Sequence, residues 1–593
     1  MILRRLAEHY DRMVAEGSTE LPPPGYSTQK VSFCIVLNPD GSVNQFESLL
    51  EQDGNTKHAR PLIVPGQNKP TGQGINPCLL WDNAEYLLGY AEEPKRVERA
   101  LHEFEASRVR HLALRTAITH PSYSTVCAFF YKWRPELAAM HPELPEIVSN
   151  FGVFRIAGET QFVHQQIQPP QPAAVEEQCG SPVMCLVSGE IEPAARLHEP
   201  KIKGVSGAQT SGALVVSFNA SAFTSYGKEQ SFNAPVGKTT VFKYANALNR
   251  LLSMPDRRVR LGDATFVYWA DHRTAVEDVF ALFFSGEPSE NETQSPQEDQ
   301  KRLQEARLLL SQLRSGTQNA VPEPNDIGTR FFILGLSPNA SRLSVRLWIE
   351  ADAGEMFRRL HKHICDFHMV GGRGELPAPL WRIALATGRA EFDQKGRFKN
   401  YNSDSVSPKL AGDLARSVFT GAAYPQYLLA TMVRRIYSDG HISFERVSAI
   451  KACLVRNTRC TSNPLEIPVE LNHEASDVAY RCGRLFAILE KAQSDSAGGE
   501  LNATIKDRYF SAACITPAVV FPRLFRLNGY HLGKLETGSK IYYERLIGSV
   551  MSAPFAFPRQ LPLQEQGKFI TGYFQQRQDL YTSKRDKNLE EKE

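Results

Sequence analysis

The segment between Cys185 and Leu248 combines residue types that suit contacts with a nucleic-acid backbone. Glycines recur through it and let a partner come close to the main chain. Lys201 and Lys203 are separated by one residue, so on an extended strand they would share a face and could contact neighbouring phosphates. We therefore predict phosphate contacts for Lys201, Lys203 and Lys228, with a long polymer rather than a small molecule as the ligand.

Arginines form further short basic clusters. Arg258 and Arg260 alternate in the sequence and could share a strand face, and Arg342 lies close to Arg346. A solvated surface is the alternative interpretation of any one such cluster. We predict that Arg258 and Arg342 add phosphate contacts.

A polar loop between Pro61 and Pro77 carries amides and one lysine among glycines. These side chains are of the types that read base edges in a DNA groove. The residues predicted to read a DNA motif are Gln67, Asn68, Lys69, Gln73 and Asn76. The alternative is a polar surface turn before a helix that has Asp82 or Asn83 as its N-cap.

Residues that could ligate a metal are sparse. His361, Cys365 and His368 recur at helical spacing, but the sequence places no fourth ligand near them. Asp271 and His272 are isolated, whereas a metal-dependent nuclease needs several converging ligands. We predict no metal and no catalytic group, and a stand-alone metal-dependent nuclease is the rival hypothesis.

A nucleotide-binding loop is suggested by Gly237, Lys238 and Thr239. That motif requires a glycine five residues before Gly237, and Phe232 occupies this position. The glycine-rich turn that would hold phosphates is thus incomplete, and we predict no cofactor. A nucleotide-dependent nucleic-acid enzyme stays a variant of the rival hypothesis.

Bulk composition is that of a globular protein. The chain has 593 residues, 22% of them charged, and a net charge of +3. This net charge is compatible with a nucleic-acid partner but does not by itself indicate one. Its ten cysteines match neither a zinc ribbon nor a redox pair. No apolar run approaches the ~20 residues of a membrane span, and the first helix lacks a signal peptide's apolar stretch, so we expect a cytoplasmic protein.

Turn and periodicity signals predict an α+β protein. Residues 31–49 read as a β-hairpin turning at Asn38 to Gly41, and 330–350 as a second hairpin followed by a helix from Gly354 to Phe367. Helical patterns dominate after about 410. The predicted domains are an N-terminal α+β domain with the motif-reading loop at 1–180, a central α+β domain with basic strands and an acidic insertion near 286–300 at 181–410, and a helical domain at 411–593.

Several blocks of the sequence resemble one known family. They include PPPGYS from Pro22, GINPCLLWDNAEYLLG from Gly74, HEPKIKGVSGAQTSGALVVSFN from His198, GDATFVYWA from Gly262, RFFILGLSPNASRLSVRLW from Arg330, PLWRIA from Pro379 and FITGYFQQRQDLY from Phe569. Together they make the chain similar, essentially end to end, to the large subunit of the type I-C CRISPR Cascade surveillance complex.

The resemblance implies a non-catalytic subunit that recognises the protospacer-adjacent motif in double-stranded DNA and promotes duplex opening and R-loop formation. Base pairing with a guide then reads the long sequence, while protein reads a short duplex motif. The implied partners are the CRISPR RNA, the backbone subunits that bear it, and a helicase-nuclease that performs cleavage.

A small helical subunit is also implied, produced from an internal start between about Val469 and His473. No methionine stands there, so an unusual start codon would be required. A scaffold that binds only protein subunits is a third hypothesis, which the salt dependence of DNA binding would test.

Overall fold

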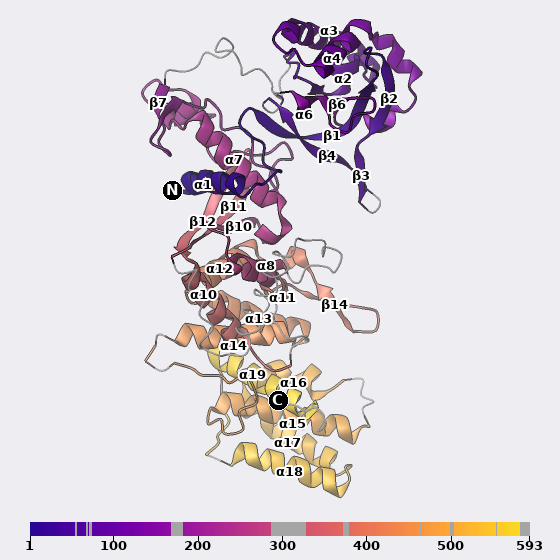
Figure 1. The fold of residues 1–593 in the computed structure, drawn as a ribbon. Coiled ribbons are helices and arrows are strands. Elements are labelled where there is room, and N and C mark those ends of the chain that lie inside the picture. The colour runs from indigo at the N-terminus through magenta and orange to yellow at the C-terminus, as the bar shows by residue number, and fades with distance from the viewer. Residues whose placement is uncertain are drawn as a thin grey trace. The chain divides into compact units, whose positions relative to one another are not determined.

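The computed structural model describes residues 1–53, 56–66, 69, 74–167, 182–285, 328–371, 379–459, 461–462, 464–498, 503–552 and 554–581 (Figure 1). The chain divides into two compact units. Unit 1 comprises Met1–Lys203 and Thr210–Arg250, and unit 2 comprises Gly204–Gln209 and Leu251–Glu593. The predicted insertion near 286–300 lies outside the described residues. The predicted three-domain division, with boundaries near 180 and 410, stays a prediction.

A six-stranded sheet forms the centre of unit 1. Its strand order is β3-β4-β1-β6-β5, and β2 pairs with β1. The strands are β1 (Tyr26–Leu37), β2 (Val43–Ser48), β3 (Leu50–Asp53), β4 (Thr56–Pro65), β5 (Trp81–Asp82) and β6 (Phe151–Ile156). The first predicted hairpin is confirmed: β1 and β2 are antiparallel, and Gly41 turns between them with a φ of 85°.

Helices cover this sheet and contribute a core rich in aromatic residues. They are α2 (Ala84–Leu88), α3 (Val97–Ala113), α4 (Pro121–Lys132), α5 (Leu144–Ile147) and α6 (Val163–Gln166). Phe129 and Phe130 of α4 pack against Phe154 of β6, with ring centroids 5.6 and 5.9 Å apart.

Two long helices and a small hairpin complete unit 1. They are α1 (Ile2–Ala15), α7 (Lys238–Ser253), β7 (Pro182–Met184) and β8 (Ile191–Pro193). Tyr10 of α1 packs edge-to-face on Phe242 of α7, and Lys243 pairs with Asp11 at 2.8 Å. The last three residues of α7 belong to unit 2.

Unit 2 begins with a four-stranded antiparallel sheet of order β12-β11-β10-β9. Its elements are β9 (Arg258–Leu261), β10 (Ala264–Ala270), β11 (Arg330–Asn339), β12 (Arg342–Asp352), α8 (Ala275–Ser285) and α10 (Ala353–Phe367). The second predicted hairpin and the helix after it are therefore confirmed. Asp352 caps α10 by accepting hydrogen bonds from the amides of Gly354 and Glu355.

Helices make up most of the rest of unit 2, with one small hairpin among them. These elements are α11 (Leu380–Ala386), β13 (Ala390–Phe392), β14 (Phe398–Tyr401), α12 (Pro408–Thr420), α13 (Gln426–Asp439), α14 (Phe444–Thr458), α15 (Val478–Ser496), α16 (Ile505–Ile515), α17 (Pro517–Leu532), α18 (Thr537–Met551) and α19 (Leu563–Tyr581). The predicted fold class, mixed α/β followed by a mainly helical part, is confirmed.

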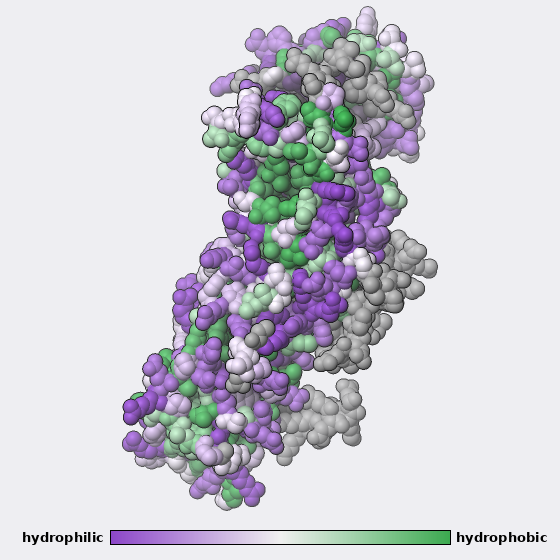
Figure 2. Space-filling view, turned by 90° about the vertical axis from the view of Figure 1, so that its left-hand side faces the viewer, coloured by the Kyte–Doolittle hydropathy of each residue, from purple (hydrophilic) through white to green (hydrophobic). Residues whose placement is uncertain are grey.

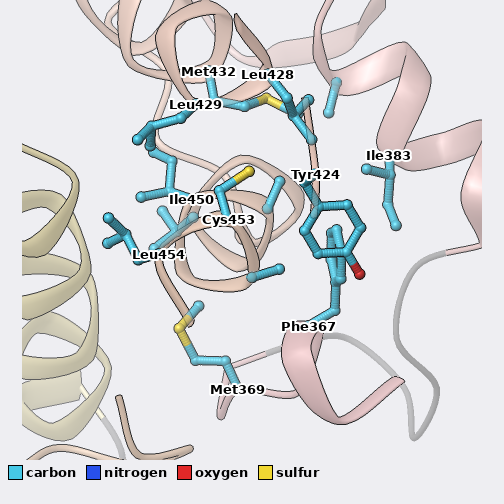
Figure 3. Packing of buried hydrophobic residues seen from close by; sticks show 14 of the residues in the cluster. Phe367, Met369, Ile383, Tyr424, Leu428, Leu429, Met432, Ile450, Cys453 and Leu454 are labelled. Atoms are coloured by element: carbon cyan, nitrogen blue, oxygen red, sulfur yellow. The ribbon is translucent and has the colours of Figure 1, made fainter. Parts of the chain in front are cut away.

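One apolar core links the sheet of unit 2 to its helices. Phe266 of β10 lies 5.8 Å from Phe419 of α12, ring centroid to ring centroid. Farther along the chain, α14 directs Ile450 and Cys453 into the cluster around Met432 of α13 (Figure 3). This core is continuous across position 410.

The helices α15 and α19 cross with almost no space between their backbones. A Cβ atom on Gly483 of α15 would overlap the carbonyl oxygen of Phe569, and one on Gly572 of α19 would overlap that of Tyr480. Each helix thus supplies a glycine at the point where the other approaches. Glycine is the only residue that fits either position without movement of the helices.

No helix among the described residues is long and apolar enough to cross a membrane. Hydrophilic residues cover most of the face drawn in Figure 2, and hydrophobic residues gather in patches between them.

Candidate nucleic-acid interface

The loop between β4 and β5 is closed at its base by buried hydrogen bonds. The indole Nε1 of Trp81 donates to the carbonyl of Pro65 at 2.6 Å, and the amide of Leu80 donates to Nε2 of His111 at 3.0 Å. The other ring nitrogen of His111 lies 2.7 Å from the carbonyl of Ser107. Burial lowers the pKa of His111 to about 4, so the neutral imidazole bridges these two backbone groups at pH 7.

Lys69 is held inside this loop. Its amine pairs with the fully buried carboxylate of Asp82 and lies 3.2 Å from the centroid of the Tyr86 ring. Burial raises the pKa of Asp82, while Lys69 and the amides of Cys78 and Asn83, both 2.8 Å away, oppose that shift. Lys69 therefore fastens the loop to the sheet, and its predicted reading of a DNA motif stays a prediction.

The other residues predicted to read a motif divide in two groups. Gln67, Asn68 and Gln73 lie outside the described residues. Asn76 is exposed, and its backbone amide donates to the Tyr86 hydroxyl at 3.1 Å. This hydrogen bond fixes the backbone from which the Asn76 side chain projects. Asn83 caps α2 by accepting from the Tyr86 amide, as the alternative interpretation of the loop expected.

Lys201 and Lys203 lie beside each other, as their spacing predicts. Ile202 between them is buried and forms a β-bridge with Ala213. A Cβ atom on Gly212, whose φ is 93°, would lie 2.8 Å from Cβ of Lys201 and 3.3 Å from Cγ of Lys203. Both side chains therefore run past the bare backbone of this glycine.

Asn249 of α7 fixes the main chain of both lysines. Its Nδ2 donates to the carbonyl of Lys201 at 3.1 Å, and its Oδ1 accepts from the amide of Lys203 at 2.8 Å. A single amide side chain thus holds the two lysine backbones in register. The lysine pair is presented by fixed backbone rather than by a mobile loop.

A third lysine, Lys30 of β1, lies close enough to affect this pair. Partial burial lowers the pKa of Lys203, and the positive charges of Lys30 and Lys201 lower it further. We call Lys30, Lys201 and Lys203 the lysine group. Repulsion within it favours an anion such as phosphate, which relieves the repulsion on binding.

Sequence reasoning missed Lys30. Buried and exposed residues alternate along the start of β1, so the pattern could have shown that Lys30 faces outward. Its proximity to residues 201 and 203 depends on the tertiary fold.

Lys228 lies at the end of a tight turn. The turn places Tyr226 and Gly227 at positive φ, 52° and 69°, and leaves Tyr226 98% exposed. Asn233 braces it: Oδ1 accepts from the amide of Ser225 at 2.8 Å, and Nδ2 donates to the carbonyl of Lys228 at 3.0 Å. Lys228 is exposed, as a phosphate contact requires.

In unit 2, Arg258 and Arg260 of β9 are exposed on one face, whereas Arg257 before them is largely buried. Arg257 pairs with Asp278 at 3.1 Å, and despite its burial, Glu277 and Asp278 raise its pKa. Arg257 therefore stabilises the fold.

Arg342 opens β12 opposite Asn339 and is half-buried. It belongs to unit 2, as Arg258 does, whereas the lysine group belongs to unit 1.

Comparison with known families decides the class of this protein. The sequence matches the family described as CRISPR-associated protein (Cas_Csd1) over residues 6–581, nearly the whole chain. This chain belongs to the Cas_Csd1 family. The predicted resemblance is confirmed at the level of a CRISPR-associated, Cascade-type protein. A comparison with curated proteins yields no match.

In this member of the Cas_Csd1 family, the N-terminus of α7 already carries an anion. The Glu192 carboxylate accepts from the amide of Thr239 and the hydroxyl of Thr240, both at 3.1 Å, and occupies the space that a side chain on Gly237 would need. Phosphates bind at such helix termini in nucleotide-binding loops. Here a carboxylate from β8 takes that place.

The residues considered as metal ligands are not brought together in the described parts of this Cas_Csd1 family member. No group of three or more histidine, cysteine, aspartate or glutamate residues there could hold a metal ion. Cys365 and His368 are exposed, and Asp271 accepts from the amide of Arg330 at 3.0 Å, which ties the end of β10 to β11.

Proposed function

We propose that this chain is the large subunit of a type I-C CRISPR Cascade complex. In this role it recognises the protospacer-adjacent motif in double-stranded DNA, promotes duplex opening and R-loop formation, and helps to recruit the helicase-nuclease. Its further partners are the CRISPR RNA, the guide-bearing backbone subunits and a small helical subunit. We propose that it acts in the cytoplasm and breaks no bonds itself.

The lysine group is the observation that carries the proposal. A duplex presents closely spaced phosphates, and a protein that neutralises them gains affinity by releasing counterions. Lys201 and Lys203 run side by side past Gly212, with Lys30 near them, and no carboxylate pairs with these three lysines among the described residues. Such an arrangement fits a phosphate backbone better than a small substrate.

The β4–β5 loop supplies the motif-reading part of the proposal. Its base is fixed by Trp81 and by Lys69 with Asp82, which gives a motif-reading element a fixed point of attachment. We assign base contacts to Gln67, Asn68, Gln73 and Asn76, and assign Lys69 to positioning the loop. Backbone contacts then orient the protein, and the loop supplies specificity.

A double variant of the lysine group tests the proposal. In full-length chain, Lys201→Gln with Lys203→Gln should lower the slope of log affinity against log salt by about 1.8 for duplex DNA, since each phosphate contact contributes about 0.9. The matched control, Lys95→Gln with Arg134→Gln, removes two exposed charges elsewhere in unit 1 and should leave the slope unchanged.

Two results would overturn the proposal. One is parent protein that binds duplexes with and without the adjacent motif equally, both alone and after assembly with guide-bearing subunits. The other is cleavage of labelled DNA by purified parent chain with magnesium or manganese, because this would make the chain an enzyme.

A further inference from the structure

The hairpin of β13 and β14 in unit 2 has a rigidly held base. Arg446, whose side chain is fully buried, donates hydrogen bonds to the carbonyls of Ala386, Gly388 and His441 at 2.8 to 3.0 Å. It also pairs at 2.6 Å with Asp439, which in turn accepts from the amide of Ala390 at 2.9 Å. A buried guanidinium with this many partners fixes where the hairpin leaves the protein.

The tip of the hairpin is also ordered by its own side chains. Asp393 accepts from the amides of Lys395 and Arg397 at 2.9 and 2.8 Å and pairs with the guanidinium of Arg397 at 2.9 Å. Gly396 completes the turn with a φ of 73°. These bonds, mainly that from the Arg397 amide, lower the pKa of Asp393, so the turn keeps its anchor at neutral pH.

Apolar and charged side chains of the hairpin have different surroundings. Phe398 stacks on His441 with ring centroids 4.2 Å apart, and Phe392 meets the same imidazole edge-on at 5.9 Å. Both phenylalanines stay partly exposed, Phe392 at 43% and Phe398 at 40%. The exposed polar residues between and around them are Arg389, Gln394, Lys395, Arg397, Lys399 and Asn400.

The acids of this segment are used internally. Residues 389–401 contain four basic and two acidic side chains, and Glu391 accepts from Asn402 at 2.8 Å as Asp393 anchors the turn. Lys395 and Lys399 have no carboxylate partner among the described residues. Lys399 is the extra residue of a β-bulge, a feature that redirects a side chain out of the strand pattern.

We propose that the β13–β14 hairpin is a second phosphate-binding element, which contacts the nucleic-acid backbone without reading its sequence. This inference rests on the proposed function, which supplies DNA as the polymer. Protein interfaces are depleted in lysine and are centred on aromatic anchors. Here the two exposed phenylalanines contact His441, while Lys395 and Lys399 have no carboxylate partner among the described residues and both acids of the segment are used within the protein. The basic side chains outnumber the exposed rings, so a phosphate backbone is the favoured partner.

The test compares two double variants of the full chain. Lys395→Gln with Lys399→Gln removes the unpaired charges of the hairpin, and Lys534→Gln with Lys540→Gln removes two exposed charges elsewhere in unit 2. Affinities for two duplexes of unrelated sequence are measured from 50 to 200 mM salt. The hairpin variant should lower the salt slope by about 1.8 for both duplexes equally, and the control should match the parent.

The outcomes separate this inference from the proposed function. If the hairpin variant keeps the parent's slope while the Lys201/Lys203 variant lowers it, the inference is wrong and the proposed function stands. An unchanged slope with loss of copurifying protein subunits would assign the hairpin to protein docking and also overturn the inference. If the parent shows no salt-dependent binding to duplexes, both proposals fail together.

Discussion

The lysine group of unit 1 and the buried charges of unit 2 use the same residue types in opposite ways. Lys30 and Lys203 are exposed and lie near another lysine, without a carboxylate among the described residues. In unit 2, by contrast, Asp366 is buried and pairs with Arg456 at 2.6 Å and with Arg459. A count of basic residues therefore says little about ligand binding, because the partners decide the role.

Most donors of the buried cluster find acceptors within the protein, although Nη2 of Arg456 is buried without a hydrogen-bond partner. Lys451 donates to the carbonyl of His368 at 2.8 Å and approaches that of Asp366 at 3.3 Å. Arg456 also donates to the carbonyl of Ser417 at 3.2 Å, and its guanidinium lies 4.1 Å from the centroid of the Tyr424 ring. Among the described residues the lysine group has no such set of acceptors, so its ammonium groups are open to water or to an outside anion.

The largest expected effect is that of Asp366→Asn, which tests the structural role of the buried charges in unit 2. It leaves the charge of Arg456 buried without a carboxylate, and loss of one partner of such a pair costs about 3–5 kcal/mol. Urea unfolding should show a loss of this size, while Asp404→Asn, at an exposed carboxylate, should change stability by less than about 0.5 kcal/mol. Equal effects of the two variants would contradict a structural role for the buried cluster.

A second test uses pH. Burial lowers the pKa of Lys451 to about 8, against an ordinary value of 10.5, while the charge of Asp366 opposes the shift. Between these two pH values the unfolded chain binds more protons than the folded one, so the contribution of Lys451 to stability rises with pH.

The difference in unfolding free energy between parent and Lys451→Met isolates this contribution. It should shift in favour of the parent by at most about 3 kcal/mol from pH 8 to 10.5, since one pKa unit corresponds to about 1.4 kcal/mol. Urea titrations of both proteins at the two pH values measure it. A difference that is independent of pH would show that Lys451 titrates as a solvated lysine.

The smallest expected effect concerns the lysine group of unit 1. Gly212→Ala should cost about 1–2 kcal/mol of stability, because alanine disfavours a φ of 93°, and should weaken duplex binding severalfold by displacing Lys201 and Lys203. Gly189→Ala imposes a similar backbone penalty at a φ of 81° with nothing within 4 Å. Fluorescence anisotropy with duplex DNA should show weaker binding for Gly212→Ala than for Gly189→Ala. Equal losses of affinity would contradict a role for Gly212 in positioning Lys201 and Lys203.

Local signals in the sequence were enough to predict much of the fold. The turn at Asn38 to Gly41 and the helix that ends at Phe367 depend on residues near each other in the chain, and both are present. The hairpin of β13 and β14 was not predicted. Its strands are only three and four residues long, and its base depends on Arg446, more than 40 residues away.

The candidate site was predictable only in part. The closeness of Lys201 to Lys203 follows from their separation by one residue, Ile202, which forms a single β-bridge. The approach of Lys30 depends on the tertiary fold. The pairing of Lys69 with Asp82 joins residues that are 13 positions apart in the chain. Burial of a single aspartate, which the sequence does not reveal, decides what that lysine does.

The glycine crossing of α15 and α19 bears on how the C-terminal part could be made as a separate product. Both Gly483 and Gly572 follow position 473, so a polypeptide that begins there would contain both sides of the close contact between α15 and α19. It would lack the α14 side chains Ile450 and Leu454, which lie 3.0 and 3.2 Å from where a Cβ on Gly567 would stand. A polypeptide that begins at position 473 would therefore expose an apolar surface around Gly567 of α19. This surface would fit the α14 side chains of the longer chain.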